Sequence, residues 1–156
     1  MRHLFLISTV AFALLTVFGC SKSKDKEEVD AADPVISVTS PTDDQIFQRG
    51  GNNYIQFSGV VSDDMALKEL EVTLEWHGET KSTEIDGDGT VTAVYEPWET
   101  QTQTISLTGK SQSFTQKNLF DKPIPDNIQD GFYVLTFVVT DGAEKSFTVT
   151  RTIQII

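Results

Sequence analysis

The strongest constraint on the fold of this chain is the alternation of apolar and polar side chains in the segment LKELEVTLEW, residues 67–76. Successive residues of a β-strand point to opposite faces, whereas an α-helix would scatter the same positions around its circumference. One face of this strand would carry Leu70, Val72, Leu74 and Trp76. The segment therefore predicts a strand with one buried face and one solvated face.

Residues 131–155 repeat this pattern on both sides of a turn signal, Asp141-Gly142. The apolar positions before the turn are Tyr133, Leu135, Phe137 and Val139, and those after it are Phe147, Val149, Ile153 and Ile155. Arg151 interrupts the second set, which predicts a β-bulge or an arginine that reaches over the edge of the sheet. Shorter runs of strand character occur at residues 35–39 and 54–62, and no segment after the amino-terminal apolar run has helical periodicity. The chain is therefore predicted to be all-β.

The middle of the chain alternates less clearly. Residues 80–96 predict a hairpin about the sequence DGDG, and residues 100–120 predict two edge strands that turn near Gly109-Lys110. The second of these segments contains no acidic residue, although the rest of the chain after the amino-terminal run is acidic. Lysine and polar side chains protect the edge of a sheet from pairing with neighbours. This composition is therefore explained either by edge protection or by a recognition surface.

Two phrases resemble the immunoglobulin-like domains of bacterial surface proteins: FSGVVSDDMALKELEVTL at 57–74 and IPDNIQDGFYVLTFVVTDGAEKSFTV at 124–149. The resemblance implies that the first phrase forms strands B and C and the second forms strands F and G. It also implies that Tyr133 forms a tyrosine corner and that Trp76 is the core tryptophan of strand C. The expected fold is an immunoglobulin-like β-sandwich over residues 33–156.

Residues 1–19 have the layout of a secretory signal, with Arg2 followed by an uncharged apolar stretch at 4–18. A helix that crosses a bilayer needs about 20 apolar residues, so this stretch is short for a stable span. The Gly19-Cys20 ending resembles the lipobox of bacterial lipoproteins, in which the cysteine carries diacylglycerol. Cys20 is the single cysteine of the chain, so an internal disulfide is excluded. We expect Cys20 to be lipidated and to anchor the protein to a membrane.

Residues 20–32 are expected to form a flexible tether, because their Lys, Asp, Glu and Ser side chains bury too little apolar surface to order a chain. The run KSKDKEE at 22–28 resembles the tag that sends lipoproteins of the Bacteroidetes type to the outer face of the outer membrane. The order of signal, lipobox, tether and one immunoglobulin-like domain resembles a family of uncharacterised Bacteroidetes lipoproteins. The expected location is the cell envelope, where the chain would be a surface-exposed lipoprotein of the outer membrane.

Charge and length exclude some partners. Removal of the 19 residues of the signal from the 156 leaves 137 residues, enough for one domain, and the net charge of −11 becomes −12 when Arg2 is lost. An acidic chain repels phosphate backbones and anionic lipid head groups. We therefore expect no nucleic-acid partner, and membrane contact through the lipid alone.

Catalytic residues are scarce. His77 is the one histidine that remains after the signal, and there is no Gly-x-Ser-x-Gly nucleophile motif. Zinc is disfavoured because one histidine and no free thiol leave mainly carboxylates as ligands. We expect a non-catalytic module, with a carboxylate-dependent hydrolase as an alternative because paired carboxylates serve glycosidases.

Two binding hypotheses remain open. In the predicted topology, one end of the sandwich gathers four aspartates, Asp33, Asp63, Asp64 and Asp141, which favour calcium because it binds oxygen ligands. Ordinary turn chemistry explains aspartates in loops equally well. Three aromatic residues, Tyr95, Trp98 and Phe120, lie in or beside the unusual middle segment. They would either stack on a glycan or pack over the open end of the core. The chain is thus expected to recognise a glycan or an envelope protein, or to be a calcium-stabilised adhesion or assembly subunit.

Overall fold

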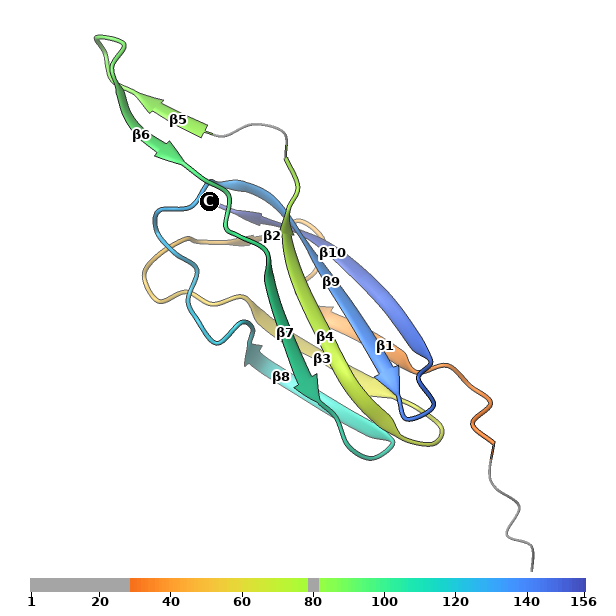
Figure 1. Ribbon diagram of the computed structural model, residues 1–156. Helices are drawn as coiled ribbons and strands as arrows, with labels where there is room; N and C mark the ends of the chain where they lie inside the picture. Colours follow the sequence, from red (N-terminus) through yellow and green to blue (C-terminus); the bar gives the residue numbers. More distant parts are fainter. Residues whose placement is uncertain (1–28, 79–81) are drawn as a thin grey trace, which may run out of the picture.

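A computed structural model of the chain describes residues 29–78 and 82–156, and the signal and Cys20 lie outside the described residues. The described chain is all-β: two sheets face each other as a sandwich, and a two-stranded hairpin projects from one end (Figure 1). Within these residues no helix has the length and hydrophobicity needed to cross a bilayer. The predicted all-β immunoglobulin-like sandwich is confirmed.

The larger sheet has five strands in the order β2-β10-β9-β4-β7. These are β2 (Gln45–Phe47), β10 (Ser146–Ile155), β9 (Gly131–Asp141), β4 (Leu67–Trp76) and β7 (Gln101–Ser106). The smaller sheet has the order β1-β3-β8, with β1 (Val35–Ser40), β3 (Gln56–Ser62) and β8 (Ser111–Asn118). All pairings in the two sheets are antiparallel except that of β2 with β10. The predicted strands B, C, F and G correspond to β3, β4, β9 and β10.

The core lies between the two sheets and consists of the predicted alternate positions. Phe57 of β3 packs with its ring centroid 5.1 Å from that of Phe114 in its own sheet and 5.1 Å from that of Phe137 across the sandwich. The fully buried apolar residues of β4 and β9 are Leu70, Val72, Leu74, Tyr133, Leu135, Phe137 and Val139. The period-two prediction for these two strands is therefore confirmed.

Tyr133 forms the tyrosine corner that the resemblance implied. Its hydroxyl donates a hydrogen bond of 2.8 Å to the carbonyl oxygen of Gln129 and accepts one of 3.0 Å from the backbone N–H of Trp98. The ring is fully buried, and this burial is the main cause that raises the pKa of the Tyr133 phenol. The corner therefore ties the start of β9 to the chain that enters β7.

Trp76 differs from its expected role, because it is only partly buried. As the last residue of β4, it lies at the end of the core and packs edge-on against Tyr133 with ring centroids 5.0 Å apart. Gly78 and Gly131 make room for this ring: a Cβ atom added to them would approach the indole to 2.3 Å and 2.6 Å. The tryptophan thus closes the end of the sandwich rather than filling its centre.

In strand β10 the structure differs from the prediction at Arg151 and Phe147. Its pairing with β9 is continuous from Ser146 to Ile155, so there is no bulge at Arg151. Instead, the Arg151 guanidinium reaches across to β1, where it donates to the carbonyl oxygen of Val38 at 3.4 Å. Phe147 is 40% exposed rather than buried. Within the described residues, β2 pairs only with residues 153–155 of β10, so the start of β10 forms an edge of the sheet and its side chains are less covered.

The middle of the chain forms the predicted hairpin and edge strands. β5 (Ser82–Ile85) and β6 (Val91–Tyr95) pair with each other about the DGDG turn and extend away from the sandwich (Figure 1). β7 and β8 are edge strands, but of different sheets, and the turn near Gly109 carries the chain from one sheet to the other. The short strand β2 was not predicted.

Candidate functional site

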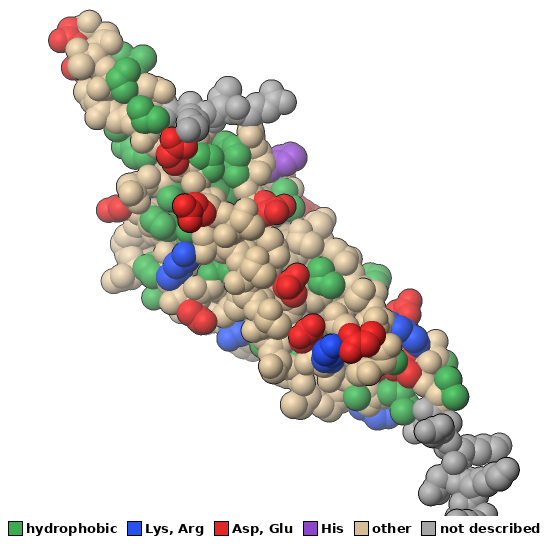
Figure 2. Space-filling model, in the orientation of Figure 1, with side chains coloured by type: hydrophobic (Ala, Val, Ile, Leu, Met, Phe, Trp, Pro, Cys, Tyr) green, Lys and Arg blue, Asp and Glu red, His purple; other side chains and the backbone are tan. Residues whose placement is uncertain are grey.

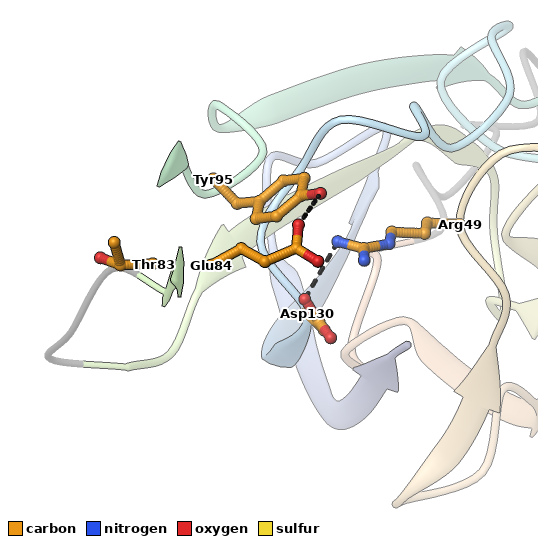
Figure 3. A pocket seen from close by; sticks show the side chains of 5 residues that line it. All are labelled: Arg49, Thr83, Glu84, Tyr95 and Asp130. Atoms are coloured by element: carbon orange, nitrogen blue, oxygen red, sulfur yellow. Dashed lines mark hydrogen bonds and ion pairs between the residues drawn. The ribbon is translucent and has the colours of Figure 1, made fainter. Parts of the chain in front are cut away.

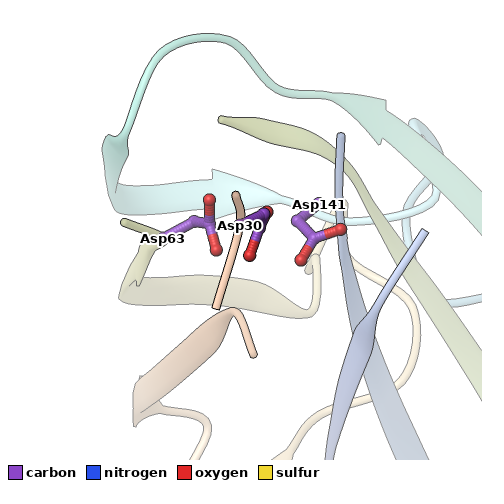
Figure 4. A group of neighbouring side chains, drawn as sticks. All are labelled: Asp30, Asp63 and Asp141. Carbon is purple, nitrogen blue, oxygen red and sulfur yellow. The ribbon is translucent and has the colours of Figure 1, made fainter. Parts of the chain in front are cut away.

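Three carboxyl groups meet at the end of the sandwich where the tether enters (Figure 4). Asp63 follows β3, Asp141 ends β9, and Asp30 belongs to the segment before β1. One carboxylate oxygen from each lies within 4.8 Å of the other two. The antiparallel order of the strands brings these residues together, since β3 and β9 both end at this side of the molecule.

In both Asp63 and Asp141, one carboxylate oxygen accepts hydrogen bonds from backbone N–H groups and the other does not. Oδ1 of Asp63 accepts hydrogen bonds from the backbone N–H groups of Met65 and Ala66, at 2.8 and 2.7 Å. Oδ1 of Asp141 likewise accepts bonds of 2.8 Å from Ala143 and Lys145. Such bonds are the ordinary turn chemistry of aspartate.

The second carboxylate oxygen, Oδ2, of each aspartate lacks a hydrogen bond from the residues that the structure describes. Oδ2 of Asp63 and Oδ2 of Asp141 are buried and have no hydrogen-bond partner within the described chain. The two residues are 9% and 0% exposed, respectively. Buried polar atoms in proteins nearly always have a partner, so these two oxygens require an explanation.

Lys145 supplies one positive charge beside the cluster. Its Nζ donates to Oδ1 of Asp30 at 2.8 Å and to the carbonyl oxygens of Asp30 and Ala32 at 3.0 and 2.9 Å. The hydrogen bond to Asp30 is the main cause that raises the pKa of Lys145, against the opposing effect of desolvation. Lys145 therefore holds the tether end and leaves the Oδ2 atoms of the other two aspartates without a donor.

Of the four aspartates that the sequence placed at this end, two belong to the cluster and two do not. Asp33 and Asp64 are exposed and contribute no carboxylate to it. The backbone of Asp64, rather than its carboxylate, is engaged, because its carbonyl oxygen accepts a bond from Lys110. Asp30 was missed because it lies in the segment predicted to be a tether.

A second candidate site is a shallow depression between hairpin β5–β6 and the opposite end of the sandwich (Figure 3). It has a volume of about 290 Å³ and is lined by Arg49, Thr83, Glu84, Tyr95 and Asp130. The residues come from both sides: Thr83, Glu84 and Tyr95 belong to the hairpin, while Arg49 follows β2 and Asp130 precedes β9.

The polar groups of this depression interact with one another. Arg49 forms an ion pair of 3.0 Å with Asp130, and its guanidinium carbon lies 4.8 Å from the centre of the Tyr95 ring. The Tyr95 hydroxyl donates to Oε2 of Glu84 at 3.3 Å. One aromatic ring, one guanidinium and two carboxylates thus face a small open hollow, and they can offer donors and acceptors to a polar ligand.

Of the three predicted aromatic residues, two pack against each other and the third, Tyr95, lines the depression. Trp98 and Phe120 are 6% and 9% exposed and pack edge-on with ring centroids 6.3 Å apart. Neither presents a free ring face to a sugar. Tyr95 is partly exposed and lines the depression. His77 is exposed just after β4.

The hairpin itself exposes aliphatic side chains. Ile85, Val91 and Val94 are 59%, 53% and 55% exposed. Figure 2 shows hydrophobic side chains along this projecting arm, away from the body of the domain. Acidic residues at the turn, Asp86 and Asp88, lie beside them.

These features define a single-domain immunoglobulin-like module with an inserted hairpin. The chain belongs to the family described as Domain of unknown function (DUF4625), which matches residues 20–156. No curated protein matches the sequence.

Two solved structures resemble the chain distantly. One is catalytically inactive OgpA from Akkermansia muciniphila in complex with an O-glycopeptide, with 13% identity and a TM-score of 0.38 over 85% of this chain and 32% of that chain. The other is a DUF4466 family protein from Parabacteroides merdae, with 16% identity and a TM-score of 0.36 over 78% of this chain and 43% of that chain. The chain spans less than half the length of each, and likenesses of this size carry no functional conclusion.

Proposed function

We propose that this protein is a non-catalytic binding module, held at the bacterial cell envelope by a lipid on Cys20, which binds a partner protein of the envelope through hairpin β5–β6. The observation that carries the proposal is the exposure of Ile85, Val91 and Val94, each more than half accessible to solvent. Exposed aliphatic groups that gather on one projecting element mark interaction surfaces.

The architecture of the hairpin supports this function. β5 and β6 form a two-stranded sheet of their own, separate from both sheets of the sandwich. An isolated two-stranded hairpin is only marginally stable in water. A partner that adds a strand to an open edge, or covers the aliphatic side chains, would stabilise it.

The charge around the hairpin indicates the chemistry of the partner. Glu84, Asp86 and Asp88 accompany the three aliphatic residues. A complementary surface would therefore combine an apolar strip with lysine or arginine at its rim, since charge complementarity steers association and selects partners.

The anchor is tested first. Each buried CH₂ group contributes about 0.8 kcal/mol, so the several acyl chains of a lipidated cysteine hold a protein on a membrane essentially permanently. Cells grown with radiolabelled palmitate should label the native chain and not a Cys20→Ala variant. Label on that variant, or its retention in the membrane after signal cleavage, would contradict the anchoring.

The hairpin surface is tested by photo-crosslinking in intact cells from a reactive amino acid at position 94. We expect a discrete protein adduct that is lost when Ile85 and Val91 are both replaced by threonine, which keeps the β-branched shape and removes apolar surface. The matched control is Val35→Thr with Ile46→Thr, because these residues are 51% and 56% exposed but lie outside the hairpin. An adduct unaffected by the hairpin variant, or equally lost in the control, would refute the proposal.

A polar glycan is the second candidate ligand, supported by the depression lined by Arg49, Glu84, Tyr95 and Asp130. Sugar hydroxyls both donate and accept hydrogen bonds, and these side chains offer the complementary groups. A glycan array should show a hit that Arg49→Ala and Tyr95→Ala remove. A blank array would count against this candidate, and release of free sugar from a bound glycan would favour the hydrolase alternative.

A further inference from the structure

Two buried carboxylate oxygens at the tether end have no hydrogen-bond donor in the described part of the chain, and a cation would stabilise them. Oδ2 of Asp63 and Oδ2 of Asp141 are buried without a hydrogen bond from any described residue. One carboxylate oxygen of each of these two aspartates lies within 4.8 Å of a carboxylate oxygen of Asp30. A buried, unpaired carboxylate oxygen is costly, and like charges a few ångströms apart in a protein interior repel each other. Lys145 donates a hydrogen bond to the Asp30 carboxylate and compensates its charge, but it bonds to neither of these two oxygens.

The geometry suits a calcium ion. Calcium binds carboxylate oxygens at roughly 2.3–2.6 Å, so two oxygens on the same ion are at most about 5 Å apart. The three carboxylates satisfy this limit, because their ligand oxygens lie within 4.8 Å of one another. Magnesium forms shorter bonds, of about 2.0–2.1 Å, and demands near-ideal octahedral geometry, so it tolerates a loosely spaced set of carboxylates less well than calcium does. The cluster contains no histidine or cysteine, the ligands that zinc prefers.

Charge and access agree with a divalent cation. Three carboxylates and the Lys145 ammonium leave a local charge of −2, which one calcium ion neutralises. A depression of about 280 Å³, lined by Asp30, Met65, Ala66, Gly142 and Ala143, adjoins the cluster. Asp30 is the member of the cluster that lines this depression, so solvent and the water ligands of a calcium ion would reach the cluster from the Asp30 side.

We propose that Asp30, Asp63 and Asp141 form a calcium site that ties the membrane tether to the sandwich. Asp63 and Asp141 are fixed by their turns, whereas Asp30 comes from the segment before β1. Calcium therefore clamps that segment against the ends of β3 and β9. In the calcium-bound form the segment around Asp30 is held in a defined position against the sandwich.

The site is tested on the full-length chain, extracted in detergent and freed of metal with a chelator. Titration calorimetry with calcium chloride should show one site with a Kd of about 10⁻⁴–10⁻³ M, the range of extracellular calcium modules, and weaker binding of magnesium. At ten times the Kd, mass action should raise the Tm by about 5 °C. No heat of binding together with no rise in Tm would overturn the proposal.

Asparagine variants separate ion binding from turn formation. Asp63→Asn and Asp141→Asn keep an oxygen that can cap each turn but lose the charge, and each should weaken calcium binding at least tenfold. The matched control is Asp64→Asn, which is next to Asp63 in sequence and lies outside the cluster. Unchanged affinity in the first pair, or equal loss in the control, would refute the assignment.

Asp30→Asn tests the clamp, and it alters no turn of the sandwich. It should weaken calcium binding and abolish a calcium-induced slowing of hydrogen exchange in a peptide that covers residues 29–34. Calcium binding without any slowing of exchange in the native chain would refute the clamp. Full binding by the Asp30→Asn variant would exclude the tether residue from the site.

Discussion

The two ends of the sandwich carry the same kinds of side chain in different states. Strand β9 joins them, with Asp130 before its first residue and Asp141 at its last. At the hairpin end, Asp130 has Arg49 as a partner at 3.0 Å and is half exposed. At the tether end, Asp141 is fully buried and one of its oxygens has no partner within the described residues.

This difference separates a surface for macromolecules from a site for an ion. Paired, solvated charges beside exposed aliphatic residues destabilise the fold little in the absence of a ligand. The hairpin end is therefore stable without its partner protein. Unpaired, buried carboxylates are costly until a cation arrives. The tether end should therefore respond to calcium and chelator, and the hairpin end to ionic strength.

The largest expected effect is the loss of stability on replacing Trp98, which tests whether this residue belongs to the core or to a ligand-binding surface at the hairpin end. Trp98→Ala should lower the free energy of unfolding by about 3–5 kcal/mol, because a large buried side chain is replaced by a cavity. Urea unfolding measures the loss, and Phe132→Ala, at a residue that is 44% exposed, should cost much less. If the Trp98→Ala variant kept native stability and lost ligand binding, Trp98 would have to be assigned to the ligand-binding surface instead of the core.

The tyrosine corner should give the next largest effect. Tyr133→Phe keeps the ring and removes the hydroxyl that bonds to Gln129 and Trp98, which should cost about 1–3 kcal/mol in urea unfolding. Tyr95→Phe is the matched control, since its hydroxyl lies in the open depression. Equal losses in both variants would contradict a special role for the corner.

Alkaline pH should weaken the same corner. Burial raises the pKa of Tyr133 in the folded chain above its unfolded value of 10.0, so its contribution to stability is present below pH 10. That contribution is lost as the pH rises through the folded pKa, because the unfolded chain releases the proton more readily. The urea midpoint should therefore fall between pH 9 and pH 11 by less in Tyr133→Phe than in the native chain, and identical pH profiles would rule out this cause.

The smallest effects compare one aspartate from each end in chelator. Asp130→Asn should lose less than about 1 kcal/mol, and the loss should shrink in high salt, as expected of an exposed ion pair. Asp63→Asn should lose nothing or become more stable, because it removes a repulsive charge and keeps a turn acceptor. Thermal unfolding at two salt concentrations measures both. An Asp63→Asn variant that is less stable than the native chain in chelator would show that the two ends do not differ in the proposed way.

Much of the fold could be predicted because its signals are local. Residues 70–76 alternate strictly, and residues 133–139 place Tyr133, Leu135, Phe137 and Val139 at every second position; both segments form strands with buried apolar faces. The DGDG turn likewise lies within the hairpin that it predicted. Strand β2 has three residues and pairs in parallel with the distant β10, so its own sequence held no comparable signal.

The candidate sites were harder to predict because they join distant segments. Asp63 and Asp141 were foreseen from an assumed topology that places their loops at one end. Asp30 was assigned to the tether by its composition, and Arg49 has no local pattern that links it to Tyr95. Exposure was equally unpredictable for Phe147, because it depends on which part of β10 has a second neighbouring strand.

The sequence by itself determined that this chain forms two β-sheets around one apolar core, because alternation along a strand sorts side chains between core and solvent wherever the strand is placed. The tertiary structure alone decided which carboxylates meet, which aromatic rings are buried and which aliphatic residues stay exposed. Those outcomes depend on how strand ends and connecting segments are brought together, and no single stretch of the chain contains that information.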